Sequence, residues 1–364
     1  MPTEPQADPT REGARILTIC NACRYCEGYC AVFPALELRT NFAPADLNYV
    51  ANLCHNCAEC YYACQYAPPH EFAVNVPKTL AQIRARSYQQ YAWPSPLGLL
   101  FRRNGLLVFL TLVSAIVIWT AITNGSTAAS AQFYQVVSHR VMVAVFGGVS
   151  IFVLIALSTG CFRFWRDSGQ NPANLFAWKE ALNDTLRLSY LHGDGQGCTC
   201  PQQHRSLARW WFHQLTFYGF LLCFAATSVA AIYHYAFGWR APYGYFSVPV
   251  VLGTLGGIGL LVGPAGLFWL KQRGDVHTRD PKQDGMDFAF IALLFTSSAT
   301  GLLLLALRET SAMPTLLAIH LATVLALLLT LAYGKFVHGI YRMAALMRYA
   351  LERSHVKGRK IAGA

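Results

Sequence analysis

Eight of the chain's 12 cysteines fall into two segments with identical spacing. Three thiolates in a C-x-x-C-x-x-C run can bind three irons of one [4Fe–4S] cluster, while a fourth cysteine further along binds a neighbouring cluster. The spacing therefore predicts two clusters that exchange their fourth ligands. The predicted sets are Cys20, Cys23, Cys26 and Cys64 for the first cluster, and Cys54, Cys57, Cys60 and Cys30 for the second.

A structural zinc site is the alternative interpretation of these segments. Zinc also uses C-x-x-C pairs, but it needs only four ligands and would leave half of each segment unused. The usual cluster run ends in Cys-Pro, whereas Ala31 and Gln65 follow the fourth cysteines here. That departure concerns the local backbone and not the number of ligands, so two iron–sulfur clusters and an electron-carrying function are favoured.

The composition indicates that most of the chain lies in a membrane. Hydrophobic residues make up 54% of the 364 residues and charged residues only 13%, against about 25% charged in soluble proteins. The first 90 residues are polar and rich in cysteine, and most long apolar runs follow Leu97. Met1–Gly13 lacks the apolar stretch of a signal peptide. We therefore expect a cytoplasmic head, where thiols stay reduced, followed by a membrane anchor.

Six segments have the ~17–25 apolar residues that a bilayer requires. They are Leu106–Ile122, Val141–Leu157, Phe212–Tyr235, Val248–Leu270, Phe288–Leu307 and Thr315–Tyr333. With the N-terminus inside, all of the 29 basic residues except Arg140, Arg240 and Arg308 fall on the inner side, as the positive-inside rule requires. This predicts a multi-pass protein of the bacterial inner membrane with both termini in the cytoplasm. The net charge of +11 then follows from topology and does not indicate nucleic-acid binding.

The expected fold class is mainly α, with a ferredoxin-type two-cluster domain followed by a six-helix, cytochrome b-like membrane bundle. Between the two, Lys78–Arg86 predicts a short helix, and Pro94 and Pro96 prevent its continuation. Trp93 and Phe101 are typical of an interfacial anchor. The expected parts are a cluster domain (1–76), an interfacial linker (77–105), a membrane domain (106–340) with a cytoplasmic loop (160–211), and a basic cytoplasmic tail (341–364).

Histidines at two of the spans are the second chemical signal, because ionisable residues inside membranes are usually functional. The third span begins near His213 and ends near His234, and His320 and His338 bracket the sixth. On one continuous helix, His320 and His338 stand a whole number of turns apart and share a face. Antiparallel spans then pair His213 with His338 near the cytoplasm and His234 with His320 near the outer face. Each pair could supply the axial ligands of a b-type haem.

Other polar and small residues allow more than one interpretation. His139 competes for the outer ligand position, and an isolated interfacial histidine can be a mere polar cap. The loop with His192, Cys198, Cys200 and His204 could bind zinc, but its tight C-x-C spacing favours a docking loop with free thiols. Gly219 and the Gly253–Gly266 series could receive a macrocycle, although ordinary helix packing is favoured. Cys161 and Cys223 are expected to be packing residues.

With these residues in view, the chain resembles the tricarballylate and citrate utilisation protein B family, which is related to the membrane half of a flavohaem protein of aerobic cobalamin synthesis. The strings that carry the resemblance are Cys20–Cys30, Cys54–Cys64, Ala67–Phe72, Leu215–Phe224, Leu252–Gly257 and Tyr333–Arg342. The resemblance implies a partner, an FAD-dependent dehydrogenase for tricarballylate or a similar carboxylate, whose flavin this chain reoxidises.

The expected function is therefore electron transfer from the partner's flavin through two clusters and b-type haem to quinone. No Gly-x-Gly-x-x-Gly unit for binding a flavin is visible, which suits a separate flavoprotein. No catalytic residues are expected on this chain. A membrane redox sensor or assembly scaffold, and electron supply for oxygen-dependent cobalamin synthesis, are the alternatives.

Overall fold

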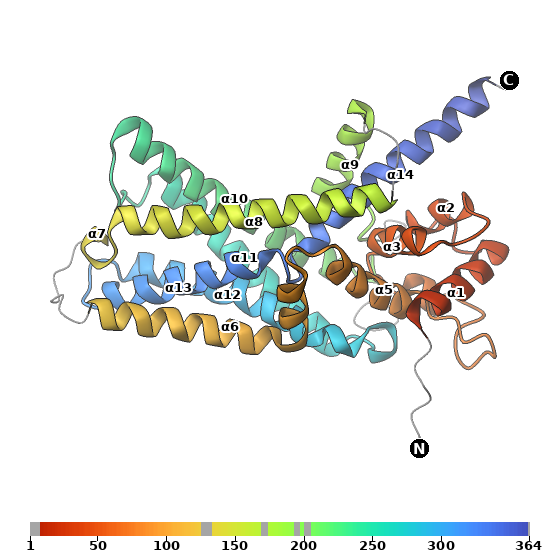
Figure 1. Cartoon of the computed structure of the whole chain (residues 1–364), viewed down its shortest axis with the longest axis horizontal. Coiled ribbons are helices and arrows are strands. Elements are labelled where there is room, and N and C mark those ends of the chain that lie inside the picture. The colour runs from red at the N-terminus through yellow and green to blue at the C-terminus, as the bar shows by residue number, and fades with distance from the viewer. Residues whose placement is uncertain (1–7, 125–132, 169–173, 193–196, 200–204, 363–364) are drawn as a thin grey trace, which may run out of the picture.

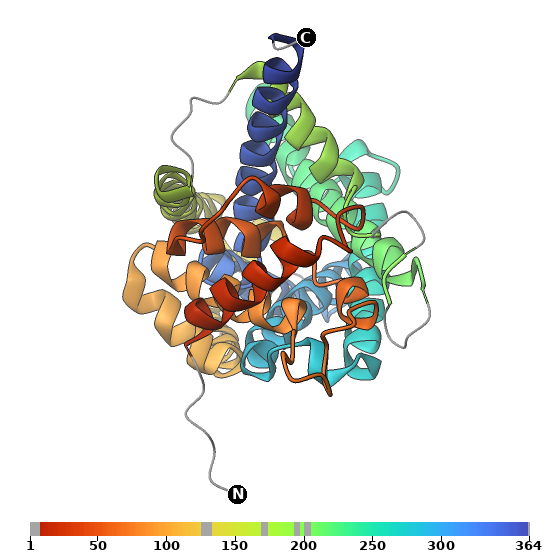
Figure 2. The same cartoon turned by 90° about the vertical axis from the view of Figure 1, so that its right-hand side faces the viewer.

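The computed structural model describes residues 8–124, 133–168, 174–192, 197–199 and 205–362 (Figure 1). Over these residues the fold consists of helices, and the only β pairing is an isolated bridge between Cys198 and Ser206. This confirms the mainly α class. A unit of short helices near the N-terminus lies across one end of a bundle of long helices, as Figure 2 shows from that end.

The N-terminal unit contains five helices: α1 (Pro9–Cys23), α2 (Val32–Glu37), α3 (Pro44–Leu53), α4 (Glu59–Tyr62) and α5 (Val76–Tyr91). Proline is tolerated in the first turn, where its missing N–H is not needed, and it begins α1 and α3. The side chain of Asn75 caps α5 by accepting a hydrogen bond from the Lys78 N–H at 3.1 Å. Leu17, Val50 and Leu80 are fully buried where α1, α3 and α5 meet.

The long helices run side by side along the longest axis of the molecule (Figure 1). They are α6 (Ser95–Asn124), α8 (His139–Ser168), α10 (Ala208–Phe237), α11 (Val248–Arg273), α12 (Asp284–Ala306) and α13 (Met313–Leu331). The short helix α7 (Phe133–Val136) lies at the far end, and the one-turn helices η1 (Val276–Thr278) and η2 (Pro281–Gln283) precede α12.

Five segments among the described residues are long and apolar enough to cross a membrane: α8, α10, α11, Pro281–Ala306 and α13. They match five of the six expected spans and support a membrane protein. α6 covers the first expected span, but many of its side chains lie outside the described residues. The sixth crossing therefore stays a prediction.

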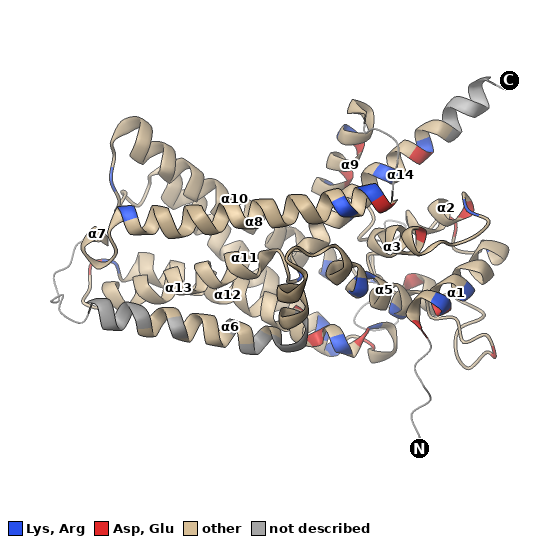
Figure 3. Cartoon of the chain, viewed as in Figure 1, with Lys and Arg blue, Asp and Glu red and all other residues tan. Residues whose placement is uncertain are grey.

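Basic residues concentrate at the end of the bundle that carries the N-terminal unit (Figure 3). The opposite end carries few, among them Arg240 and Arg308. The final helix α14 (Val337–Ala362) also lies at the basic end, so the two described ends of the chain are on the same side of the bundle (Figure 1). The assignment of that side to the cytoplasm remains a prediction from the positive-inside rule.

Two glycines show how closely α10 and α11 pack. A Cβ atom on Gly256 would lie 2.8 Å from the backbone nitrogen of Cys223, and one on Gly219 would lie 2.9 Å from the carbonyl oxygen of Gly256. Only glycine permits such an approach of two helix backbones. The helix-packing interpretation of these positions is thus confirmed.

The prediction that one continuous helix carries His320 and His338 is wrong. Helix α13 ends at Leu331 and α14 begins at Val337. The backbone turns at Gly334, whose N–H donates to the carbonyl of Thr330 at 2.8 Å. A Cβ on Gly334 would lie 3.0 Å from the ring of Phe101, so α6 packs against this turn. The whole-turn spacing of the two histidines therefore does not place them on one helix face.

Helix α14 connects the bundle to the N-terminal unit, and helix α9 (Leu175–Arg187) packs against α14, where Glu180 pairs with Arg353. Arg348 of α14 forms an ion pair with Asp46 of α3 at 3.1 Å, and the Tyr49 hydroxyl donates to Glu352 at 3.0 Å. Buried residues of α5, α8 and α14 continue the core of the N-terminal unit into the base of the bundle. The cysteine segments are thereby fixed relative to the membrane helices.

Candidate functional site

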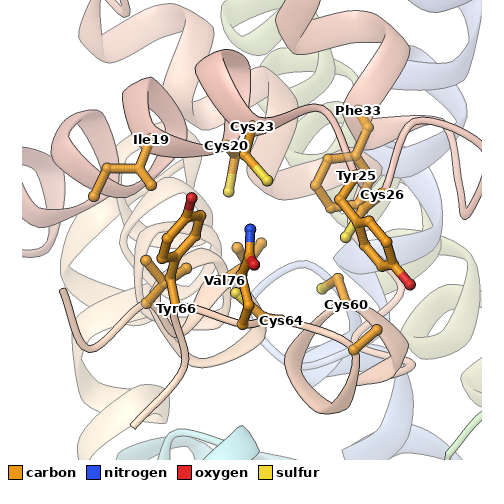
Figure 4. A pocket seen from close by; sticks show the side chains of 13 residues that line it. Ile19, Cys20, Cys23, Tyr25, Cys26, Phe33, Cys60, Cys64, Tyr66 and Val76 are labelled. Carbon is orange, nitrogen blue, oxygen red and sulfur yellow. The ribbon is translucent and has the colours of Figure 1, made fainter. Parts of the chain in front are cut away.

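The first cysteine site is a cavity of about 230 Å³ in the N-terminal unit (Figure 4). Cys20 and Cys23 reach it from the end of α1, and Cys26 from the loop that follows. Cys64 lies across the cavity, and Cys60 of α4 lines another wall. The fourth cysteine of the second segment is thus brought to the first three of the first segment.

The second cysteine site adjoins the first. Cys30, Cys54, Cys57 and Cys60 line a smaller cavity of about 20 Å³, and Cys60 borders both cavities. This space is roughly the size of one water molecule, and the four cysteines lie around it. The structure brings together the two sets of four cysteines that the spacing predicts. Ligation of iron by these sets stays a prediction.

The chemistry of the donor set suits iron–sulfur clusters. Burial, with repulsion between neighbouring thiolates, raises the pKa of Cys20 and of Cys26 to about 12. Thiolates so close together require a compensating positive charge, which iron supplies.

The loop between α9 and α10 covers the second site. Cys198 is 1% exposed, and its thiol donates to the Leu191 carbonyl at 2.6 Å. A hydrogen bond with Cys198, together with burial, raises the pKa of Cys57. The Thr199 hydroxyl donates to the Cys57 carbonyl at 3.2 Å. The burial of Cys198 does not suit the exposed docking loop that the sequence suggested; Cys200 and His204 lie outside the described residues.

The structure brings His213 and His338 together, as expected for the inner pair. Their ring centroids are 6.0 Å apart and the ring planes cross at 80°. His213 lies near the start of α10, and His338 lies in the first turn of α14. The Nδ1–H of His338 donates to the Lys335 carbonyl, so the lone pair of Nε2 is the one that could bind a metal. These two residues fit the axial ligand set of a b-type haem.

The expected outer pair is not brought together. His234 stacks on His139, with ring centroids 3.9 Å apart and planes at 29°. His320 instead contacts α12, where its Nδ1 lies 3.1 Å from the Thr300 hydroxyl and its ring packs against Gly301. The competing residue His139 is therefore the neighbour of His234. As the rings lie, they are in face-to-face contact, so an iron between them requires the two helices to part.

The second cysteine site lies next to the inner histidine pair. Arg209, one turn before His213 on α10, donates to the His55 carbonyl at 2.9 Å. Arg342, one turn after His338 on α14, donates to the Cys54 carbonyl at 2.6 Å. Both helices that carry the inner pair therefore touch the Cys54–Cys64 segment. The sequence offered no local signal for these contacts, because the partners are more than 150 residues apart.

Comparison with known proteins places the whole chain in one family. A family model described as "Citrate utilization protein B Fer4-like domain" matches residues 13–90, and one described as "Citrate utilization protein B" matches residues 94–358. Citrate utilization protein B of Escherichia coli is 50% identical over 372 residues, which cover 99% of this chain and 96% of that protein. No solved structure was found to match the chain.

Proposed function

The chain belongs to the citrate utilization protein B family, and we propose that it is the membrane electron-transfer subunit of a dehydrogenase for citrate, tricarballylate or a similar carboxylate. The observation that carries the proposal is the order of its sites. A cysteine-lined cavity near the surface shares Cys60 with a buried one, and the buried one lies beside His213 and His338. Such a row of sites leads from solvent to the membrane helices.

In this proposal the residues of the chain hold redox groups close together and exclude water. Four cysteines from both segments hold each [4Fe–4S] cluster, and His213 with His338 hold a b-type haem. When bound, these groups supply one-electron transfer. The cover that Cys198 and Thr199 form over Cys57 keeps the second site dry, whereas the first stays accessible. A further haem would use His139 and His234.

The electron donor is proposed to be an FAD-dependent dehydrogenase that docks at the first cavity. Tyr25 lines this cavity and is 66% exposed, and Phe72 nearby in the unit is 40% exposed. Exposed aromatic side chains are typical anchors of protein interfaces. Docking here would bring a flavin to the accessible cysteine site and not to the buried one.

The electron acceptor is proposed to be membrane quinone, with the N-terminal unit on the cytoplasmic face of the inner membrane. The five apolar helices and the concentration of Lys and Arg at one end of the bundle support this placement. The N-terminal unit then meets a cytoplasmic dehydrogenase directly.

Dehydrogenase turnover in membranes tests the proposal. With quinone as acceptor, turnover should require this chain. With a soluble dye that accepts electrons from the flavin directly, it should not. Equal quinone-linked turnover in membranes with and without the chain would refute the proposed function, and dye-linked turnover measured in both preparations controls for the amount of dehydrogenase.

A further inference from the structure

Three arginines from three separate helices converge on the Cys54–Cys57 backbone. Arg84 of α5 and Arg342 of α14 each donate to the Cys54 carbonyl at 2.6 Å. Arg209 of α10 donates to the carbonyls of the next two residues, at 2.9 and 2.6 Å. The same nitrogen of Arg84 also donates to the carbonyl of Ala51, in the last turn of α3, at 3.2 Å. The segment is thus held by guanidinium groups on several sides.

Two of these three arginines have no carboxylate partner among the described residues to neutralise their positive charge. Within the described part of the chain, neither Arg84 nor Arg342 forms an ion pair, and their hydrogen bonds go to backbone carbonyls. Arg84 is only 6% exposed. Burial and repulsion by Arg84 lower the pKa of Arg342 to about 10, which still leaves it protonated at neutral pH. Unpaired cations in such a site are costly unless an anion accompanies them.

Other arginines at the same interface are neutralised in the ordinary way. Arg348 lies less than two turns after Arg342 on α14, and it pairs with Asp46 at 3.1 Å and Glu352 at 3.1 Å. The excess of positive charge is therefore particular to the second cysteine segment. A cluster with four thiolate ligands carries net negative charge, and it is the anion that this segment is built to hold.

The first cysteine segment has different electrostatic surroundings. Arg24 lies within it, but this side chain is exposed and donates to its own helix, to the Asn21 carbonyl at 3.2 Å. Solvent screens such a charge far more than a buried one. Glu59 lies between Cys57 and Cys60 and adds negative charge beside Cys26 as well, and Arg205 pairs with it at 2.6 Å. Net positive charge next to the first site is correspondingly smaller.

We propose that Arg84, Arg209 and Arg342 form a cationic clamp that raises the reduction potential of the second cluster above that of the first. This proposal rests on the electron-transfer function proposed above. Reduction adds a negative charge to a cluster, and nearby buried cations stabilise that charge. The step that the clamp favours is transfer of one electron, in which the first cluster is oxidised and the second reduced, with no bond or proton moved. The clamp therefore directs electrons toward the membrane.

A redox titration of the purified full-length protein, followed by electron paramagnetic resonance, tests the clamp. Arg342→Gln keeps a hydrogen-bond donor and removes the charge, and it should shift the reduction equilibrium of the second cluster about tenfold toward the oxidised form, which is 59 mV for one electron. The first cluster should not shift. Arg342→Lys keeps the charge and should have a potential close to that of the wild type. If Arg342 acted only through its shape and hydrogen bonds, both variants would shift the potential.

Matched controls make the outcome decisive. Arg348→Gln removes a paired charge from the same helix and should leave both potentials unchanged. Arg84→Gln is the second test of the clamp and should lower the second potential even if Arg342→Gln loses iron. Unchanged potentials in clamp variants that retain full iron, or equal shifts of both clusters, would overturn the proposal. If the wild-type protein holds no clusters, the proposed function is refuted. If its clusters can be reduced and oxidised in the titration but quinone does not oxidise them, only the relay is refuted.

Discussion

The two cysteine segments have the same spacing but different surroundings. The first opens on a cavity of about 230 Å³ at the surface, beside the exposed Tyr25. The second is covered: Cys54 is 7% exposed and Cys57 9%, and arginines of three helices donate to its backbone. Identical ligands in unlike surroundings can have unlike potentials, because burial, charge and hydrogen bonds set them. In the proposed relay, the repeat provides an entry site and an exit site for electrons.

The largest effect should come from breaking the exchange of ligands between the two segments. Cys30→Ser should remove the second cluster, because Cys30 lines the second cavity. The number of non-haem irons per chain should then fall from about eight to about four. Cys64→Ser should remove the first cluster instead. Iron analysis and electron paramagnetic resonance of the reduced variants measure this. Loss of the first cluster's signal in Cys30→Ser would show that each segment binds its own cluster.

The next largest effect should come from the inner histidine pair, which tests whether the buried segment is the exit. His338→Ala should remove a b-type haem and stop reoxidation of the reduced clusters by quinone, while dithionite still reduces them. The absorbance spectrum of the reduced protein and the rate of cluster reoxidation measure this. His355→Ala, an exposed position on the same helix, is the control and should have neither effect. Normal reoxidation in His338→Ala would place the exit elsewhere.

A smaller effect is expected at the outer end of the bundle, where the path would continue. His139→Ala and His234→Ala should change the haem spectrum in the same way, because these rings lie together. His320→Ala should leave the haem spectrum unchanged, because the His320 ring is hydrogen-bonded to Thr300 and lies apart from the other two histidines. Haem content per chain distinguishes loss from mere perturbation. If His320→Ala and His234→Ala lose the same haem, the pairing first expected from the sequence is restored.

The smallest effect should come from the thiol that covers the second site. Cys198→Ala removes a thiol that can turn its S–H from the Leu191 carbonyl to the Cys57 thiolate, and it should lower the second cluster's potential by about a threefold shift in its reduction equilibrium. That is less than the shift expected for Arg342→Gln, since no charge is lost. Cys198→Ser keeps a donor and should shift less. A change confined to the first cluster would contradict the position of this loop.

Local features of the sequence were sufficient for the parts of the molecule that depend on neighbouring residues. Cysteine spacing predicted the two sets of thiols that line the two cavities, since a short segment fixes how far its side chains reach. Apolar length predicted five of the observed long helices. The pairing of His213 with His338 was also expected, although the continuous helix used in that argument ends at Leu331.

Tertiary structure alone decided which distant residues meet. The sequence by itself determined the cysteine repeat and five of the long apolar helices, because these are properties of short stretches. It did not show that Arg84, Arg209 and Arg342 share one segment, or that His139 lies on His234, because such contacts depend on how separate helices pack. Periodicity failed between His320 and His338 because it assumes an unbroken helix, and packing of Phe101 against Gly334 accompanies the break. Two identical cysteine segments thus became different sites through the helices placed around them.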